Sequence, residues 1–296
     1  MSERTSKPAA DEFDPDRGES VLSKRQLGWL LTGTVALALA AWVVEVDIPA
    51  LVSPAAREQM VAFVAEGIPP DTSSEYLFGR NLREGLLWAV IETLAISVVA
   101  TALAVVFAVP LALASSAPVM HRGPLYADAS RTRRTFGRTV AQASRFFLSF
   151  LRSVPGLVWG FLFVTAVGLG PFAGALALGV HNTGVLGKLY ADFLEDTDPM
   201  TTEAVATSGA TRFQAVCHGM IPQVTATVAS YTLYRWECTI RSATILGFVG
   251  AGGIGYYLVI TIQRLQYAKL LTAIVAVFVL VVCSDALASR LRERLT

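Results

Sequence analysis

The sequence predicts an all-α membrane protein that crosses the bilayer several times. Hydrophobic residues make up 53% of the 296 residues and charged residues only 16%, and the mean hydropathy is +0.53. A chain of this size with so little polar surface cannot cover a soluble globule. Several apolar runs also reach the length of about 20 residues that a helix needs to span the hydrocarbon core. Together these observations predict a polytopic bundle with six transmembrane helices.

The first 84 residues predict a tail, an anchor and an external connection. Residues 1–26 carry charges, Pro and Ser but few large apolar side chains, so we expect a disordered cytoplasmic tail. The uncharged run 27–44 is long enough to span the membrane, and its length favours an anchor over a cleaved signal peptide. The prolines of segment 47–84 predict an external connection with one short helix near 55–66.

Residues 85–296 predict the main membrane domain. The stretch 86–117 is too long for one upright span and contains Pro110, so it tilts, kinks or extends past the membrane on the inner side. Polar and apolar residues mix between 239 and 269, and the pattern leaves the path of that segment open. The expected spans after the first are 86–117, 146–168, 172–193, 224–239 and 270–284.

The orientation follows from the distribution of arginine. Loop 121–145 holds six arginines against the single acidic residue Asp128. An excess of Lys and Arg in short loops marks the cytoplasmic side of a plasma (inner) membrane protein. Counting spans from this loop places both termini in the cytoplasm, and the arginines near the C-terminus agree. The same count places the polar loop 203–222 on the cytoplasmic side.

The sequence of that polar loop, EAVATSGATRFQAVCHGMIP, predicts two short helices joined by a tight corner. Gly209 permits the positive φ of a tight corner, and Pro222 can begin a helix but cannot continue one. The pattern closely resembles the EAA loop of permease subunits in binding-protein-dependent ABC importers, with Val205 and Ile221 as conservative departures. Segments 152–155 and 236–255 resemble the phosphonate-import branch of that family.

The resemblance implies a type I ABC importer permease fold and a set of partners. It implies a cytoplasmic ABC ATPase dimer, an extracytoplasmic substrate-binding protein and a second permease subunit, identical or paralogous. The cargo it implies is a phosphonate or a related phosphorus oxyanion, such as phosphate or phosphite. ATP and Mg²⁺ would be bound by the ATPase, so no cofactor is expected in this chain. The positions implied to couple to the ATPase are Glu203, Ala204 and Gly209, with Arg212 at the rim.

Polar and ionisable residues within the spans are costly and are therefore candidates for the substrate pathway. Glu237 and Arg241 are four residues apart, so they either line the pathway or neutralise each other. Arg235 lies about 200° around the helix from Glu237, which makes it the leading candidate for attracting an anion. His181 and Asn182, in the fourth span, are further candidates.

The run GAGGIG contains Gly250, Gly252, Gly253 and Gly255. It fits a dinucleotide fingerprint in spacing, but a βαβ unit and a following acidic residue are missing. Its backbone N–H groups could form an anion-binding nest, or its glycines could let helices pack closely at an outer gate. We favour close packing.

Other functional classes find little support in the sequence. No P-loop, metal-ligand cluster or nucleophile–base set is present, so the chain is not predicted to be an enzyme. The basic residues sit in separate short loops rather than on one patch, which argues against nucleic acid. The main alternative is an ATP-independent secondary transporter or channel for a small anion, which would be expected to show inverted repeats or paired broken helices.

Overall fold

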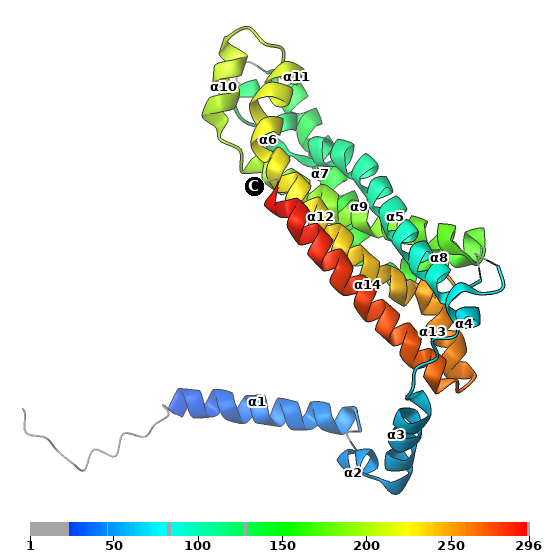
Figure 1. The fold of residues 1–296 in the computed structure, drawn as a ribbon. Helices are drawn as coiled ribbons and strands as arrows, with labels where there is room; N and C mark the ends of the chain where they lie inside the picture. Colours follow the sequence, from blue (N-terminus) through cyan, green and yellow to red (C-terminus); the bar gives the residue numbers. More distant parts are fainter. Residues whose placement is uncertain (1–23, 46, 82–83, 127–128, 295–296) are drawn as a thin grey trace, which may run out of the picture. The chain divides into compact units, whose positions relative to one another are not determined.

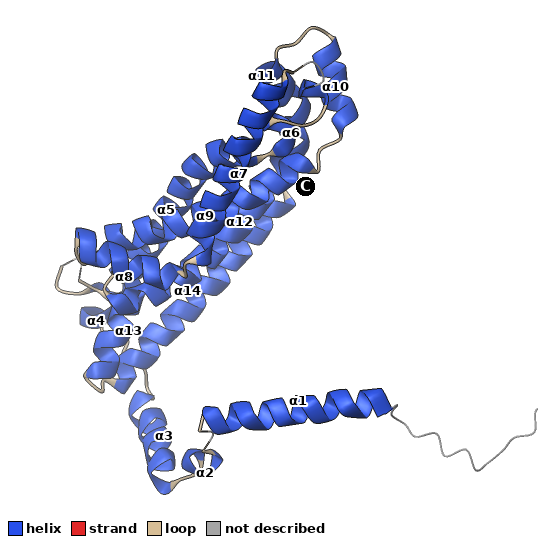
Figure 2. Cartoon of the chain, turned by 180° about the vertical axis from the view of Figure 1, so that it is seen from behind, coloured by secondary structure: helices blue, strands red, loops and turns tan. Residues whose placement is uncertain are grey.

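The computed structural model describes residues 24–45, 47–81, 84–126 and 129–294. These residues form helices and loops, and they include no strand (Figure 2). The described residues divide into two units, the first ending at Val61 and the second beginning at Ala62. Residues 1–23 of the predicted tail, 1–26, lie outside the described residues.

The first unit is dominated by α1 (Lys24–Val43), which confirms the helix predicted over 27–44. None of its span from Arg25 to Val43 is buried within the chain. A helix that is apolar and exposed along its length is suited to contact with lipid. Short α2 (Ile48–Leu51) follows, and α3 (Pro54–Gly67), which continues into the second unit, confirms the helix expected near 55–66.

The second unit is a helical bundle (Figure 1). Short α4 (Ser74–Phe78) precedes it, and α6 (Ala117–Met120) follows its first long helix. Four long helices run side by side along its length: α5 (Leu86–Ser115), α9 (Pro171–Glu195), α12 (Ile221–Leu246) and α14 (Tyr267–Glu293). Helix α5 continues through Pro110 to Ser115. The predicted stretch 86–117 is therefore one long helix that does not end at the proline.

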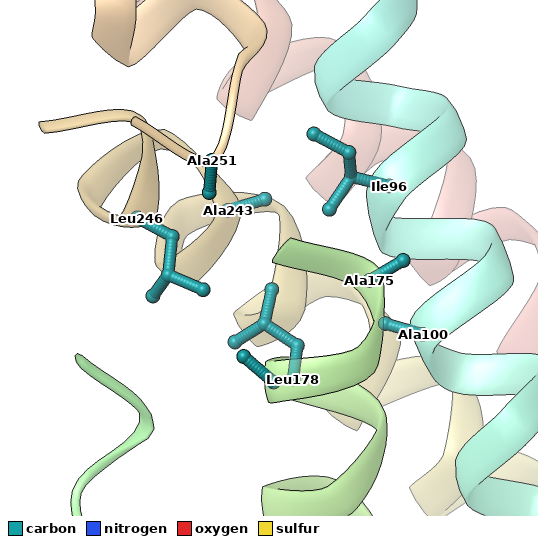
Figure 3. Packing of buried hydrophobic residues seen from close by; sticks show 8 residues of the cluster. Ile96, Ala100, Ala175, Leu178, Ala243, Leu246 and Ala251 are labelled. Atoms are coloured by element: carbon teal, nitrogen blue, oxygen red, sulfur yellow. The ribbon is translucent and has the colours of Figure 1, made fainter. Parts of the chain in front are cut away.

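The core lies where α5, α9 and α12 meet. Small residues recur on one face of α5 at four-residue spacing, and this lets the neighbouring backbones approach closely. These fully buried residues are Ala100, Ala104, Ala108 and Ala112. Figure 3 shows one cluster of this core, in which Ile96 and Ala100 face Ala175 and Leu178, with Leu246 beside them.

The third predicted span, 146–168, is wrong as a continuous helix. The structure has α7 (Arg131–Ser153) and α8 (Gly156–Val167), bent by 87° relative to each other. Pro155 causes the break, because proline lacks an N–H and drives the preceding Val154 into an extended conformation, here φ −80° and ψ 121°. Since α7 begins at Arg131, the predicted basic loop 121–145 is also largely helical.

The fifth predicted span, 224–239, is too short. Helix α12 runs to Leu246 and is followed, after a 44° bend, by α13 (Gly253–Gln263). Helix α13 thus occupies the segment whose path the sequence left open. By length and composition, three described helices can span a membrane, or up to five if each bent pair is one span. The count of six remains a prediction.

Candidate coupling element and translocation site

Two short helices, α10 (Pro199–Thr207) and α11 (Arg212–Ala215), form the helical element predicted from loop 203–222, called here the coupling element. The side chain of Asp198 caps α10 by accepting the N–H of Met200. Gly209 turns the chain with φ of 89°, a left-handed conformation that favours glycine. Thr211 and Gln214 then form a capping box that starts α11. The corner at Gly209 is confirmed.

The prediction that Pro222 begins a new helix is confirmed, but the helical backbone is not interrupted before it, whereas the prediction required an interruption. From α11 the chain continues through a π-helical segment, Val216–Met220, directly into α12. Pro222 lies in the first turn of α12, where its missing N–H leaves no hydrogen bond unmade. The coupling element is therefore connected to a long bundle helix by continuous helical backbone.

The inner face of the element packs on the bundle end. Ala215, Val216 and Met220 are buried in one apolar cluster with Tyr126 and Leu194. The apolar contacts of this cluster restrain the element relative to the bundle. A force on the element is therefore transmitted to the helices on which it packs. Figure 1 shows α10 and α11 together at one end of the bundle.

The outer face carries the predicted ATPase-coupling residues. Glu203, Ala204 and Gly209 are all exposed. Arg212, expected at the rim, is half-buried instead, with its guanidinium carbon 4.5 Å from the centroid of the Tyr126 ring. Two large apolar side chains that the sequence analysis did not select are also exposed on this element, Met200 by 75% and Phe213 by 77%.

Three of the polar residues in the spans form one hydrogen-bonded group between α9 and α12. The Nε of Arg235 donates to Oδ1 of Asn182 over 2.9 Å, and Nδ2 of Asn182 donates to Oγ1 of Thr239 over 2.8 Å. Asn182 is only 1% exposed. His181 does not join this group through a hydrogen bond; its Nδ1 lies 3.1 Å from the carbonyl oxygen of Val154, at the α7–α8 break.

Glu237 and Arg241 adopt the mutual neutralisation that the sequence left open. Nη2 of Arg241 lies 3.1 Å from Oε1 of Glu237, and Nη2 of Arg292 lies 3.2 Å from Oε2. Asp285 completes the network at 3.9 Å from Arg241. Two acidic and two basic side chains therefore join α12 to α14. Arg235 takes no part in this network, as its position around the helix predicted.

A hydroxyl-bearing cleft on α12 was missed by the sequence analysis. It has a volume of about 450 Å³. Thr227, Ser230, Tyr231 and Tyr234 follow the i, i+3, i+4, i+7 spacing of one helical face, which could have revealed them. The cleft is lined by Ala226, Thr227, Ser230, Tyr231, Tyr234 and Arg292.

The glycine run packs closely at the opposite end of the bundle. The carboxylate of Glu92 accepts the N–H of Gly253 over 2.7 Å, and Thr93 Oγ1 accepts that of Ile254 over 2.9 Å. These α5 side chains occupy the donors with which an anion nest would bind its ligand. At Gly255 an added Cβ would overlap the carbonyl oxygen of Thr244. The geometry matches the close-packing interpretation, and the gating role remains a prediction.

A membrane-embedded helical bundle with a helical element projecting from one end and polar groups between its spans has the architecture of a transport permease. Residues 126–296 match the family described as binding-protein-dependent transport system inner membrane component. The chain belongs to this family, and it is an inner-membrane permease component of an ABC importer.

Curated relatives of the chain are permeases of phosphorus oxyanions. The chain is 35% identical over 270 residues to a phosphite transport system permease protein of Stutzerimonas stutzeri, covering 91% of this chain and 89% of that one. It is 32% identical over 256 residues to a phosphate-import permease protein of Mycolicibacterium smegmatis, covering 86% of this chain and 43% of that one.

Among solved structures, the chain is similar to a chain of the MetNI methionine ABC transporter in an inward-facing conformation. The TM-score is 0.56 at 22% identity, over 71% of this chain and 96% of that one. At this level of identity the likeness establishes the fold, which is that of type I ABC importer permeases.

Proposed function

We propose that this chain moves a phosphorus oxyanion into the cytoplasm, driven by ATP hydrolysis on a partner subunit. The observation that carries the ATP-driven part is the coupling element. Its inner face is buried on the bundle, and its outer face, with Glu203, Ala204 and Gly209, is exposed. An exposed, stiff and well-anchored element fits a surface through which a partner ATPase pushes on the bundle.

The coupling element also suggests how the motion reaches the substrate route. Helical backbone is continuous from Arg212 through the π-helical segment to the end of α12 at Leu246. Closure of two ATPase subunits on ATP would move the element, and α12 would move with it. Because α12 carries both Arg235 and the hydroxyl-bearing cleft, this movement would change the access to both.

The substrate class is proposed from charge and hydrogen bonding. Arginine suits oxyanions because its planar fork donates several hydrogen bonds to one phosphate-like group. Arg235 and the hydroxyls of α12 provide such donors within the membrane domain. Polar groups at this depth face protein or a water-filled cavity rather than lipid. The relatives named for phosphite and phosphate narrow the proposal to oxyanions of phosphorus.

The remaining partners follow from the same proposal. A second permease subunit, identical or paralogous, would cover the hydroxyl-bearing face of α12 and enclose the pathway. An extracytoplasmic substrate-binding protein would deliver the anion to the end of the bundle opposite the coupling element. Both termini would lie in the cytoplasm, in keeping with the arginines of loop 121–145 and of the C-terminus.

The test is ATP hydrolysis by the full chain reconstituted in lipid with its ATPase and binding protein. Phosphite, phosphate, 2-aminoethylphosphonate and sulfate are compared at matched concentration. We expect stimulation by the phosphorus oxyanions and none by sulfate. Equal stimulation by sulfate would overturn the substrate class while retaining the ATP-driven permease. Anion uptake without an ATPase would instead support the secondary transporter or channel.

A further inference from the structure

A small basic pocket lies outside the coupling element and the proposed pathway. It is formed where α6 and the residues after it meet α7 and the last residue of α9, and its volume is about 140 Å³. Four of its residues lie on one face of α7, at the i, i+3, i+4, i+7 spacing that starts at Arg138. The pocket is lined by Ala117, His121, Arg122, Arg138, Ala141, Gln142, Arg145 and Glu195.

One basic side chain of the pocket is already neutralised. Arg145 forms an ion pair with Glu195, and its Nε donates to the carbonyl oxygen of Ser115 over 2.8 Å. The same Glu195 carboxylate accepts the N–H of Ala117 over 2.8 Å. This arrangement fixes α6, α7 and α9 to one another and forms one wall of the pocket.

The other two arginines supply positive charge that is not compensated. Arg122 and Arg138 are exposed, and neither has an ion-pair partner among the residues that the structure describes. Burial and the neighbouring arginines lower the pKa of His121, so this imidazole is neutral near pH 7. Its Nδ1 is buried and has no hydrogen-bond partner within the described ranges. The pocket therefore has two net positive charges and unused donors.

The position of the pocket along α7 is that of the headgroup layer. The arginines of α7 before the pocket are exposed, and so are Phe136 by 71% and Phe146 by 76%. A helix that exposes both arginine and aromatic side chains is typical of the layer between water and hydrocarbon. Arg138 lies within this stretch of α7.

We propose that this pocket binds a phosphate group at the inner surface of the membrane. Two arginine forks can donate several charge-assisted hydrogen bonds to one phosphate. Basic pockets between helices on the cytoplasmic side of membrane proteins bind anionic headgroups. The same chemistry would bind free inorganic phosphate, and the experiment below separates these two sources. The proposal does not depend on the cargo of the permease.

The experiment uses the full-length chain purified in detergent. Retention of phosphatidylglycerol is compared with that of phosphatidylcholine by native mass spectrometry. In a parallel arm, the thermal unfolding midpoint is measured in inorganic phosphate and in chloride at equal ionic strength. The variant R122Q/R138Q removes both uncompensated charges. The matched control, R131Q/R133Q, removes two exposed arginines of α7 that do not line the pocket.

We expect R122Q/R138Q to weaken binding about tenfold or more, the effect of losing one charge-assisted hydrogen bond. The control should bind as the unmodified chain does, and R122K/R138K should restore part of the binding. Selective loss of phosphatidylglycerol retention identifies the lipid as the source. Selective loss of stabilisation by phosphate identifies free phosphate. Equal losses in both glutamine variants, or no loss in either, would overturn the site.

Discussion

Nε of Arg235 donates to Oδ1 of Asn182 over 2.9 Å, and this bond joins α12 to α9 inside the bundle. Asn182 is itself held by Thr239, which fixes the direction of its carbonyl oxygen. Within the described part of the chain, Nε is the atom of this guanidinium that has a hydrogen-bond acceptor. Asn182 therefore orients the arginine through one nitrogen, and the other two nitrogens are the donors that the proposed function assigns to the anion.

Asn182→Ala should weaken transport without unfolding the chain. Without its acceptor the guanidinium of Arg235 loses its orientation, so the proposed site binds the anion less tightly. We expect the KM for substrate-stimulated ATP hydrolysis to rise about tenfold, equivalent to about 1.4 kcal/mol. Arg235→Lys should show a similar rise, because an ammonium cannot reproduce the planar fork. Arg264→Gln replaces an exposed arginine and serves as the control, so its KM should be unchanged. An unchanged KM in Asn182→Ala would show that Asn182 does not contribute to the proposed site.

Glu237→Gln should destabilise the bundle. Glu237 is 8% exposed and contacts two arginines, so its neutralisation leaves both with fewer acidic partners. Loss of a fully buried partner costs about 3–5 kcal/mol, and we expect about 2 kcal/mol here because the arginines are partly exposed. The unfolding midpoint in detergent measures the effect. Glu75→Gln breaks an ion pair with side-chain exposures of 84% and 70%, and its midpoint should barely change.

How far a sequence predicts such a structure depends on the range of the interaction. The helices α5 and α9, the corner at Gly209 and the separation of Arg235 from Glu237 all follow from the local sequence. The partner of Glu92 does not: its carboxylate caps α13 through Gly253, 161 residues away, and composition carries no signal for that contact. Likewise, the pattern predicts an ion pair between Glu237 and Arg241 but not the additional contact with Arg292, 55 residues further on.

The break between α7 and α8 illustrates the opposite case. Pro155 belongs to segment 152–155, which resembles a family motif, whereas hydropathy alone predicts a continuous span over 146–168. A proline after an extended residue is a local signal for a helix boundary. Here the local backbone preference at Pro155 determined the structure. The average hydropathy of residues 146–168 carries no signal for this break.

Gly255→Ala should destabilise the junction between α12 and α13. The added Cβ would overlap the backbone carbonyl of Thr244, and backbone atoms in a packed helix cannot shift at low cost. Overpacking of this kind costs about 3 kcal/mol. Gly156→Ala is the matched control, since its Cβ would lie 3.7 Å from Leu178, an ordinary contact distance. A midpoint for Gly255→Ala equal to that of the control would contradict the close packing.

The side chain of His121 should make the stability of the chain depend on pH. Burial lowers its pKa below the ordinary 6.5, with further contributions from Arg122, Arg138 and Arg145 and an opposing one from Glu195. The unfolded chain therefore binds this proton more readily, and protonation favours unfolding. The contribution to stability is full above pH 6.5 and is lost as the pH falls through the lowered pKa. We expect the unfolding midpoint to fall less steeply below pH 6.5 in His121→Asn than in the unmodified chain; parallel curves would contradict this.

The exposure of Gly209 predicts which function its replacement would damage. Its φ of 89° is strained for other residues, but Asp tolerates this region better than most, and nothing lies within 4 Å of an added Cβ. Gly209→Asp should therefore fold and insert normally, with a loss of stability of about 1 kcal/mol. If the outer face of the coupling element docks on the ATPase, the new carboxylate would meet the partner surface, and substrate-stimulated ATP hydrolysis should fall by at least about tenfold, the effect of one unfavourable buried charge.

Gly123→Asp is a stringent control for that result. Gly123 also has a positive φ, 77°, and open space around its Cβ, and it lies outside the coupling element. The two variants thus introduce the same charge and a similar backbone strain at different positions. We expect full coupling in Gly123→Asp and uncoupling in Gly209→Asp, measured with the same ATPase and lipid. Normal stimulation in Gly209→Asp would show that this corner does not touch the partner, whereas equal losses in both variants would attribute the effect to strain or charge in general.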